Sequence, residues 1–368
     1  MTREFTADQV RMTRARSQRL CGNRSRDVAG VVRDLVGVQA QDMRATRMAL
    51  RSRTTDVDAD IRSAYNQNRA LVRIWAMRGT LHMVAAEDVG WLVSLLGPVF
   101  AAADQRRRDQ LGLDAELLDK AIPALREIVT EHGPVTRADL VGRLKGKGVW
   151  LDLKTQGPAH LIGYAAMTGV ICRGPDVEKE EPTYAIIEDW AGSQRELDED
   201  EALAELARRY VASRGPVTAE DFKRWTGLPA KQARRGFELV AEDLTEVEAG
   251  GMRAWVTKGT TRSAPGREPS VALIAMFDEY LLSYASRDVL LAPQYAERIQ
   301  ARGFIKPAVL LDGRVVGTWK QKRTKSKVTV EVDPFEKLTA IEAQIESTVR
   351  DIGRFLDLEC ELRLHRPV

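Results

Sequence analysis

The stretch RGPVTAEDFKRWTG (residues 214–227) repeats the pattern of an earlier stretch, HGPVTRADLVGRL (residues 132–144). In both, Gly-Pro-Val-Thr is followed by an aspartate three residues after the threonine, as in Thr136 and Asp139, and this spacing favours the start of a capped helix. A second helical pattern comes next in each copy, followed by two strand-like segments. Helix, helix and a two-stranded hairpin is the order of a winged helix-turn-helix unit. The repeat therefore predicts two such units in tandem.

The residues before the repeat fit the same plan with looser spacing. Valine and leucine residues between positions 28 and 36 recur on one face of a helix, and Gly37 is placed to end it. Residues 58–68 predict the next helix. Residues 70–84 predict two strands joined near Gly79, which resemble a wing. We therefore expect a third unit, at the N-terminal end of the array.

The last hundred residues have a different character. Asp312-Gly313 is a hairpin signal between segments in which apolar residues alternate, and residues 335–356 predict an amphipathic helix that packs on the resulting sheet. The predicted fold class is α+β. We place three tandem winged-helix units at residues 1–120, with a connecting helix, at 121–190 and at 191–262, and an antiparallel β-domain with a terminal helix at 263–368.

The composition sets further limits. A chain of 368 residues is long enough for several small domains. Its 44% hydrophobic and 30% charged residues are ordinary for a globular protein, and we expect no apolar run long enough to span a membrane. Thr6 and Gln9 predict a capping box, so the N-terminus is expected to be folded structure and not a signal peptide. We therefore expect a cytoplasmic protein.

Cysteine and histidine residues are few and scattered. An odd number of distant cysteines argues against a disulfide framework, and no spacing is typical of a metal site. These residues are Cys21, Cys172, Cys360, His82, His132, His160 and His365. We therefore expect no metal and no other cofactor.

Basic residues gather in the segment WKQKRTKSK, although the net charge of the chain is only +3. Clustering of this kind is typical of a protein that contacts a polyanion. A hairpin tip kept in solution by its lysines would have the same sequence, so both interpretations stay open. The basic residues of the segment are Lys320, Lys322, Arg323, Lys325 and Lys327.

Gln39 and Gln41 flank one small residue directly after Gly37. In an extended segment, unlike a helix, residues two apart point the same way, so both amides can converge on one ligand. Glutamine cannot abstract a proton, yet its amide can orient a water and place a carbonyl dipole near a developing cation. This chemistry suits a substrate with a positively charged leaving group, such as an N7-alkylated guanine on a deoxyribose. The other interpretation is that the two glutamines cap or bridge loops after the helix.

Four short segments, in their order and spacing, resemble one known family. They are Gln39-Ala40-Gln41, MRGTLH (77–82), the stretch from FDEYLL to Arg-Asp (277–288), and GRVVGTW (313–319). Their order and spacing extend over nearly the whole chain. In this arrangement the segments resemble the AlkZ/YcaQ family of winged-helix DNA glycosylases. The form Gln-x-Gln resembles the AlkZ branch, because the YcaQ branch has an aspartate as its second polar residue and Asp42 lies one position too late to replace it.

The resemblance implies a C-shaped protein of three tandem winged helices and a C-terminal β-domain. It also implies monofunctional removal of N-alkylated purines and unhooking of interstrand crosslinks left by genotoxic natural products, with Gln39 and Gln41 as the catalytic pair. Both self-resistance and general repair remain open. The implied partner is double-stranded DNA that contains alkylated or crosslinked purines, with no membrane and no obligate protein partner.

The family also engages the minor groove with a β-hairpin, which we place in the C-terminal sheet near the basic turn. Sequence-independent phosphate contacts would suit an enzyme directed at lesions. Arg78, His82 and Arg287 are further candidates for DNA binding. For Arg78 and His82, the alternatives are an exposed wing arginine and a hydrogen-bonded core histidine. For Arg287, the alternative is a buried ion pair with Asp278.

Two other classes of function remain. Winged helices are mostly binding modules, so a non-catalytic DNA-binding protein, either a transcriptional regulator or a toxin-resistance binder, is the main alternative. Such a protein would need no pair of glutamines. A structural or protein-interaction array is a third possibility, although the basic hairpin favours DNA.

Overall fold

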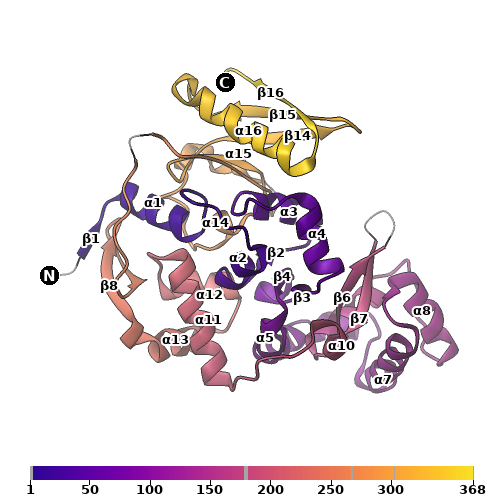
Figure 1. Cartoon of the computed structure of the whole chain (residues 1–368). Helices are drawn as coiled ribbons and strands as arrows, with labels where there is room; N and C mark the ends of the chain where they lie inside the picture. Colours follow the sequence, from indigo (N-terminus) through magenta and orange to yellow (C-terminus); the bar gives the residue numbers. More distant parts are fainter. Residues whose placement is uncertain (1–2, 178–180, 267, 302, 368) are drawn as a thin grey trace. The chain divides into compact units, whose positions relative to one another are not determined.

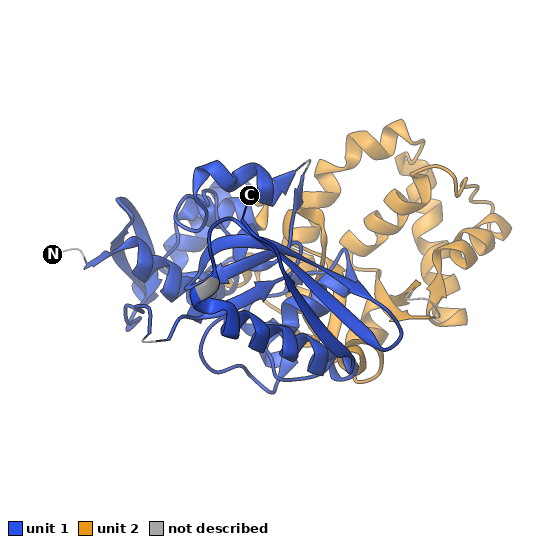
Figure 2. Ribbon diagram, turned by 90° about the horizontal axis from the view of Figure 1, so that it is seen from above, with its two compact units in different colours: residues 1–61, 203–225, 229–368 blue, residues 62–202, 226–228 orange. Residues whose placement is uncertain are grey.

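The computed structural model describes residues 3–177, 181–266, 268–301 and 303–367. They form two compact units (Figure 2). Unit 1 consists of residues 1–61, 203–225 and 229–368, and unit 2 consists of residues 62–202 and 226–228. Unit 1 is therefore assembled from separate segments of the chain, whereas unit 2 is almost continuous in sequence.

The N-terminal strand of unit 1 joins a sheet built by residues far along the chain (Figure 1). This strand, β1 (Arg3–Phe5), pairs in parallel with β8 (Leu244–Ala249), which pairs antiparallel with β9 (Met252–Thr257). The capping box predicted for Thr6 and Gln9 is confirmed at the start of the first helix. The longer helices of unit 1 outside its C-terminal part are α1 (Ala7–Ser17), α2 (Val28–Asp34), α3 (Met43–Arg51), α11 (Glu199–Arg214), α12 (Ala219–Thr226) and α13 (Ala230–Leu239), and α4 (Asp58–Asn66) passes from unit 1 into unit 2.

The C-terminal sheet of unit 1 has the strand order β10-β13-β14-β15-β16 (Figure 1). Its strands are β10 (Val271–Ile274), β13 (Ala308–Leu311), β14 (Arg314–Arg323), β15 (Lys327–Pro334) and β16 (Glu359–Leu364). The predicted antiparallel sheet is confirmed for β10 to β15, whereas the last strand, which the sequence analysis did not predict, pairs in parallel with β15. Asp312 and Gly313, with φ of 49° and 76°, form the predicted hairpin turn.

A terminal helix covers this sheet. The helix, α16 (Glu342–Leu356), buries Ile345, Val349, Ile352 and Phe355, whose spacing places them on one face. The packing predicted from the amphipathic pattern is therefore confirmed, although the helix begins seven residues later than expected because residues 335–341 turn before it. Shorter elements between β10 and β13 are α14 (Glu279–Leu282), α15 (Ala296–Ile299), β11 (Gln300–Ala301) and β12 (Phe304–Ile305).

Unit 2 contains a sheet in which strands pair in the order β4-β3-β6-β7-β5 (Figure 1). The hairpins of the first and second predicted units thus share one sheet, because β3 pairs with β6 at Arg73 and Arg173. The strands are β3 (Leu71–Trp75), β4 (Leu81–Ala85), β5 (Val135–Thr136), β6 (Ile171–Asp176) and β7 (Pro182–Ile186). The helices are α5 (Val89–Ala103), α6 (Gln105–Gln110), α7 (Ala115–His132), α8 (Arg137–Gly146), α9 (Gly157–Met167) and α10 (Ile187–Ala191).

The repeat that suggested the fold has the local structure expected of it. The Thr136 hydroxyl accepts a hydrogen bond from the Asp139 N–H, and the Thr218 hydroxyl accepts one from the Asp221 N–H. Each copy then continues into a second helix and a hairpin, β6 with β7 and β8 with β9. The mixed helix and strand fold is confirmed, and the division into three winged-helix units with the boundaries given above stays a prediction.

One stretch needs comparison with the composition-based expectation. Within the described residues, 86–103 are long and apolar enough to cross a membrane by length and composition, although Glu87 and Asp88 lie inside the stretch, so it is not an uninterrupted apolar run. Half of this stretch is buried inside the protein. The helix α5 packs against α9 and β3 and buries Trp91 and Leu96, as a core helix of unit 2 does.

Buried arginines join the segments of unit 1. Arg53 and Asp278 are fully buried and form two hydrogen bonds of 2.6 and 2.9 Å. The predicted pairing of Asp278 with Arg287 is therefore wrong. The Arg287 guanidinium instead donates to the Leu281 carbonyl and to the Gln300 side chain. Arg51 is likewise buried and pairs with an acid of α16 at 2.9 Å.

Acidic side chains across the sheet neutralise part of the basic hairpin. Glu331 on β15 lies opposite Lys320 in the strand register and accepts bonds from Lys320 and Lys322 at 2.9 and 3.0 Å. These lysines lower the pKa of Glu331 to about 2, with the hydrogen bond from Lys320 as the largest cause. Glu361 on β16 accepts from Lys327 at 2.9 Å in the same way. The hairpin segment itself contains no acid, so its sequence alone does not show that Glu331 and Glu361 neutralise part of its positive charge.

We expect Asp278→Ala to lower the free energy of unfolding by about 3–5 kcal/mol, because it leaves the Arg53 guanidinium buried without its acid. Urea unfolding followed by circular dichroism measures the change. Glu346→Ala is the control, since its pair with Arg350 is exposed and should change stability by less than about 0.5 kcal/mol. Similar losses in both variants would show that burial of the Arg53 pair is not what stabilises unit 1.

We also expect Glu331→Gln to destabilise the protein near neutral pH and to lose most of this effect as the pH falls to about 2. The folded-state pKa of Glu331 is depressed, so its contribution to stability is present above its ordinary pKa and is lost as the pH falls towards about 2. Unfolding of the wild type and the variant should be compared across this range. A stability difference that stays constant down to the lowest pH would contradict the prediction.

Candidate active site

A tight turn leads into the two glutamines. The helix α2 ends at Asp34, three residues before Gly37, which was predicted to end it. Val36 then adopts a left-handed backbone with φ of 59°, and Gly37 follows with φ of 127°. For a β-branched residue this conformation is unusual and costs about 1–3 kcal/mol, so the surrounding structure must hold it in place.

The chain then becomes extended through β2 (Val38–Gln39). The Gln39 Nε2 donates to the Gln41 Oε1 at 2.7 Å, which confirms the expectation that the two side chains lie together. Gln41 is exposed and Gln39 is half-buried, while Ala40 between them is fully buried. The two amides therefore form one polar pair that solvent can reach.

The backbone of this segment is fixed at several points. The Gln39 N–H donates to the Glu279 Oε1 at 3.0 Å, and the Gln39 carbonyl accepts from the Thr46 hydroxyl at 3.0 Å. Asp42 caps the following helix α3 by accepting from the Ala45 N–H. Asp42 thus has a structural partner of its own, in agreement with its position outside the Gln-x-Gln motif.

A small cavity lies beside the end of this segment. It has a volume of about 200 Å³ and lies between the first turn of α3 and the strand β14. Its polar rim includes Asp42, which directly follows Gln41, and Lys320 and Gln321 of the basic hairpin. Trp319, which is buried and donates its indole N–H to the Ile274 carbonyl, forms part of its wall. The start of the basic hairpin therefore lies near the glutamine segment.

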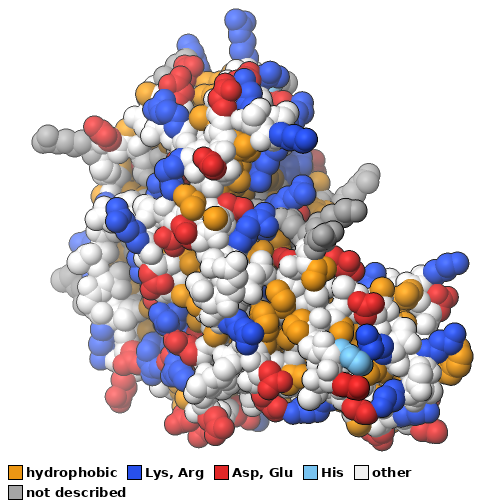
Figure 3. Space-filling view, turned by 45° about the vertical axis from the view of Figure 1, so that its right-hand side comes forward, with side chains coloured by type: hydrophobic (Ala, Val, Ile, Leu, Met, Phe, Trp, Pro, Cys, Tyr) orange, Lys and Arg blue, Asp and Glu red, His pale blue; other side chains and the backbone are white. Residues whose placement is uncertain are grey.

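The other hairpin residues have different surroundings. Lys320 and Lys322 are exposed and share Glu331, whereas Lys327 pairs with Glu361. Arg323 lies on the same strand and donates to the Gln321 side chain. Lys325 is an exposed residue in the turn. Figure 3 shows Lys and Arg side chains interspersed with Asp and Glu over the face that it draws, without one continuous basic area.

Arg78 and His82 belong to unit 2, at the turn between β3 and β4. Arg78 has a left-handed backbone with φ of 57°, and its Nη2 lies 3.4 Å from the His82 Nε2. His82 is fully buried, and its Nδ1 donates to the Thr80 carbonyl at 2.9 Å. The structure thus favours the core interpretation for His82.

The third further candidate, Arg287, lies in unit 1, and burial lowers the pKa of its guanidinium.

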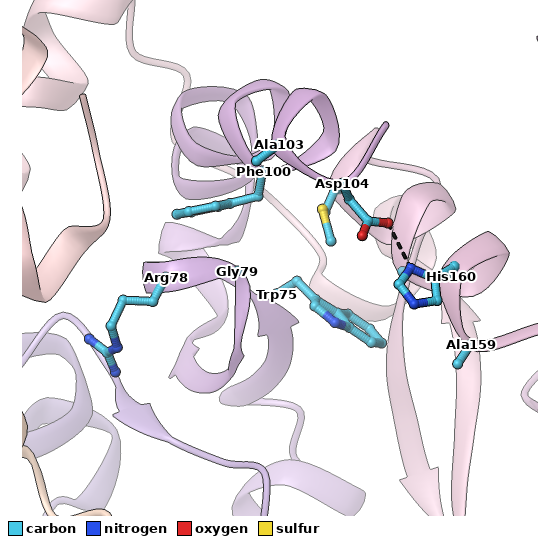
Figure 4. A pocket seen from close by; sticks show the side chains of 10 residues that line it. Trp75, Arg78, Gly79, Phe100, Ala103, Asp104, Ala159 and His160 are labelled. Carbon is cyan, nitrogen blue, oxygen red and sulfur yellow. Dashed lines mark hydrogen bonds and ion pairs between the residues drawn. The ribbon is translucent and has the colours of Figure 1, made fainter. Parts of the chain in front are cut away.

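Unit 2 contains a cavity that the sequence analysis did not predict (Figure 4). It has a volume of about 350 Å³, and Trp75 and Phe100 form its apolar walls. Asp104 accepts a hydrogen bond of 2.8 Å from the His160 Nδ1 at one end, while the Arg78 side chain points away from the other labelled residues in Figure 4. Asp104 and His160 are 56 residues apart in the sequence, so no local motif signals their contact.

Among the residues that the structure describes, no three His, Cys, Asp or Glu side chains lie close enough together to hold a metal ion. What the glutamine segment provides is a pair of neutral amides on a fixed backbone. Such a pair can position a water and direct carbonyl dipoles at a developing positive charge.

Comparison with known proteins identifies the family of this chain. The pattern of the family described as "DNA glycosylase AlkZ-like" matches residues 32–355. The chain is 28% identical over 303 residues to the "Interstrand DNA cross-link repair glycosylase" of Streptomyces sahachiroi, which covers 78% of this chain and 81% of that protein. The solved structure of the Streptomyces sahachiroi DNA glycosylase AlkZ matches with a TM-score of 0.82 and 25% identity, over 98% of this chain and all of that one. The chain therefore belongs to the AlkZ-like family of DNA glycosylases.

Proposed function

We propose that this protein hydrolyses the N-glycosidic bond of N7-alkylated purines in double-stranded DNA and unhooks interstrand crosslinks or bulky adducts left by genotoxic natural products. The observation that carries the proposal is the direct hydrogen bond between Gln39 and Gln41 on an accessible, fixed segment. The Streptomyces sahachiroi relative, named as an interstrand DNA cross-link repair glycosylase, supports the choice of substrate class. A DNA substrate also supports the expected cytoplasmic location.

The chemistry of the amide pair suits this substrate. An N7-alkylated guanine already carries a positive charge, so it leaves as a neutral base without a strong general acid. The sugar then develops oxocarbenium-like character. Carbonyl oxygens of Gln39 and Gln41 would stabilise that charge, and their amides would hold the attacking water. Neither residue needs to accept a proton, because the water that adds to the sugar releases its proton to solvent.

The surroundings of Lys320 support a monofunctional reaction. A glycosylase that also cleaves the strand needs an amine that attacks the sugar as an uncharged nucleophile, which a lowered pKa favours. Lys320 lines the cavity next to the glutamine segment, but its hydrogen bond to Glu331 raises its pKa. The ion pair with Glu331 therefore makes Lys320 a poor candidate for an amine nucleophile, which agrees with water in that role.

The basic hairpin supports binding to DNA through phosphates. Lys320, Lys322, Arg323, Lys325 and Lys327 lie on or near the turn between β14 and β15, where Glu331 and Glu361 orient several of them. Phosphate contacts of this kind do not depend on base sequence, as an enzyme directed at lesions requires. A non-catalytic DNA-binding protein would share these contacts, and only turnover distinguishes the two functions.

We expect the double variant Gln39→Ala, Gln41→Ala to release 7-methylguanine from duplex DNA about 10²- to 10³-fold more slowly than the wild type, while its DNA affinity changes less than tenfold. A single-turnover assay with alkaline cleavage of the abasic site measures release, and the strand should stay intact until alkali is added. Gln110→Ala is the control, because this exposed glutamine of unit 2 accepts a hydrogen bond from Arg107 of its own helix.

Two outcomes would contradict this proposal. Equal release by the wild type and the double variant would remove the catalytic role of the amides. No release by the wild type from either methylated or crosslinked DNA would make the non-catalytic binding protein the better interpretation. Loss of folding in the double variant would support the interpretation that the glutamines cap the loop.

We expect Lys322→Ala and Lys325→Ala each to weaken binding equally for all DNA sequences and to reduce the slope of log affinity against log salt concentration by about 1. Fluorescence anisotropy with a labelled duplex at several salt concentrations measures the slope. Lys147→Ala is the control, since Lys147 pairs with Glu127 in unit 2. Unchanged slopes in all variants would favour the solvated hairpin tip.

A further inference from the structure

Glu279 is a buried carboxylate that touches the backbone of the candidate catalytic segment. It is 1% exposed and begins the short helix α14, directly after Asp278. Its Oε1 accepts the Gln39 N–H at 3.0 Å, and its Oε2 accepts the Trp225 indole N–H at 2.8 Å. Burying a charged carboxylate is costly unless it is paired and hydrogen-bonded, so these donors and the nearby Arg214 are what make the burial of Glu279 tolerable.

The charge partner of Glu279 also contacts the other end of the turn. Arg214 is fully buried, and its Nη2 lies 3.3 Å from the Glu279 Oε2 and 2.9 Å from the Leu35 carbonyl. The Arg214 Nε donates to the Ser283 hydroxyl at 2.8 Å. Burial lowers the pKa of Arg214, and Glu279 acts against this effect. One ion pair therefore bonds to the backbone at both Leu35 and Gln39.

The segment between these two bonds is the strained turn. Val36 carries a positive φ of 59°, which a β-branched residue rarely adopts without support, and Gly37 follows with φ of 127°, which glycine accommodates. The direction in which the Gln39 and Gln41 side chains leave the backbone depends on this turn. A displacement of about 1 Å in a catalytic group can reduce a reaction rate about 100-fold.

We propose that Glu279 is a positioning residue for catalysis: together with Arg214 it clamps the turn at residues 35–39 and so aims the Gln39 and Gln41 amides at the reacting sugar. The inference rests on the proposed glycosylase function. Glu279 does not touch the substrate, and it acts through the Gln39 backbone.

Glu279→Gln tests the clamp with the smallest change of shape. The carbonyl oxygen of the new amide can accept from Trp225 and Arg214, but its NH2 group then faces the Gln39 N–H, so two donors oppose each other. Hydrogen exchange of the peptide covering residues 36–42 should become about tenfold faster. Single-turnover release of 7-methylguanine should fall about 10- to 100-fold, with DNA affinity nearly unchanged.

The matched control is Asp351→Asn, which alters another mostly buried carboxylate of unit 1. Asp351 accepts from Arg24 and Arg51 and does not contact the glutamine segment. Both variants should lose stability, but only Glu279→Gln should slow release and speed exchange at residues 36–42. If Asp351→Asn slows release to the same degree at the same temperature, the effect of Glu279 is general destabilisation and the proposal is wrong.

A double-mutant cycle distinguishes positioning from an independent role. In a Gln39→Ala, Gln41→Ala background, Glu279→Gln should cause no further loss of release, because the groups that it positions are gone. Additive losses would overturn the inference. If the wild type releases no base at all, the proposed function fails, while the exchange comparison still shows whether Glu279 holds the turn.

Discussion

Unit 1 depends on buried ion pairs between residues far apart in the sequence. Arg53 with Asp278, and Arg214 with Glu279, are almost inaccessible to solvent. A buried charge is tolerated only with its partner, so these pairs specify where the separate segments of unit 1 meet. Because the two acids are adjacent, a single short element, α14, fixes both the residues after α3 and the turn before Gln39.

The same logic of paired charges operates at the surface of the C-terminal sheet. Glu331 and Glu361 hold Lys320, Lys322 and Lys327 in defined directions and reduce their combined charge. The long-range field of this hairpin is thereby weakened, since long-range attraction depends on charge that is not compensated nearby. A lesion-directed enzyme must leave undamaged DNA quickly, and moderate phosphate affinity suits that requirement.

Local patterns predicted the local structure well. Helix caps at Thr6, Thr136 and Thr218, the Asp312-Gly313 turn and the contact between the two glutamines all follow from short-range stereochemistry. Pairings between distant residues could not be predicted from local patterns, because a carboxylate such as Asp278 can pair with any buried arginine that the fold brings near. The parallel strand β16, the partner of Asp278 and the contact of Asp104 with His160 therefore required the structure.

The interrupted sequence of unit 1 also governs the order in which the protein is built. Unit 2 lies almost entirely in residues 62–202, so its core is complete soon after that stretch leaves the ribosome. Asp278 is synthesised 225 residues after Arg53, and Asp351 is synthesised 300 residues after Arg51. Arg53 therefore lacks its acid until Asp278 has been synthesised, and Arg51 lacks its acid until α16 has been synthesised. The Gln39 N–H likewise lacks its Glu279 acceptor until 240 further residues have been made, so the glutamine segment cannot reach its described geometry before α14 has been synthesised.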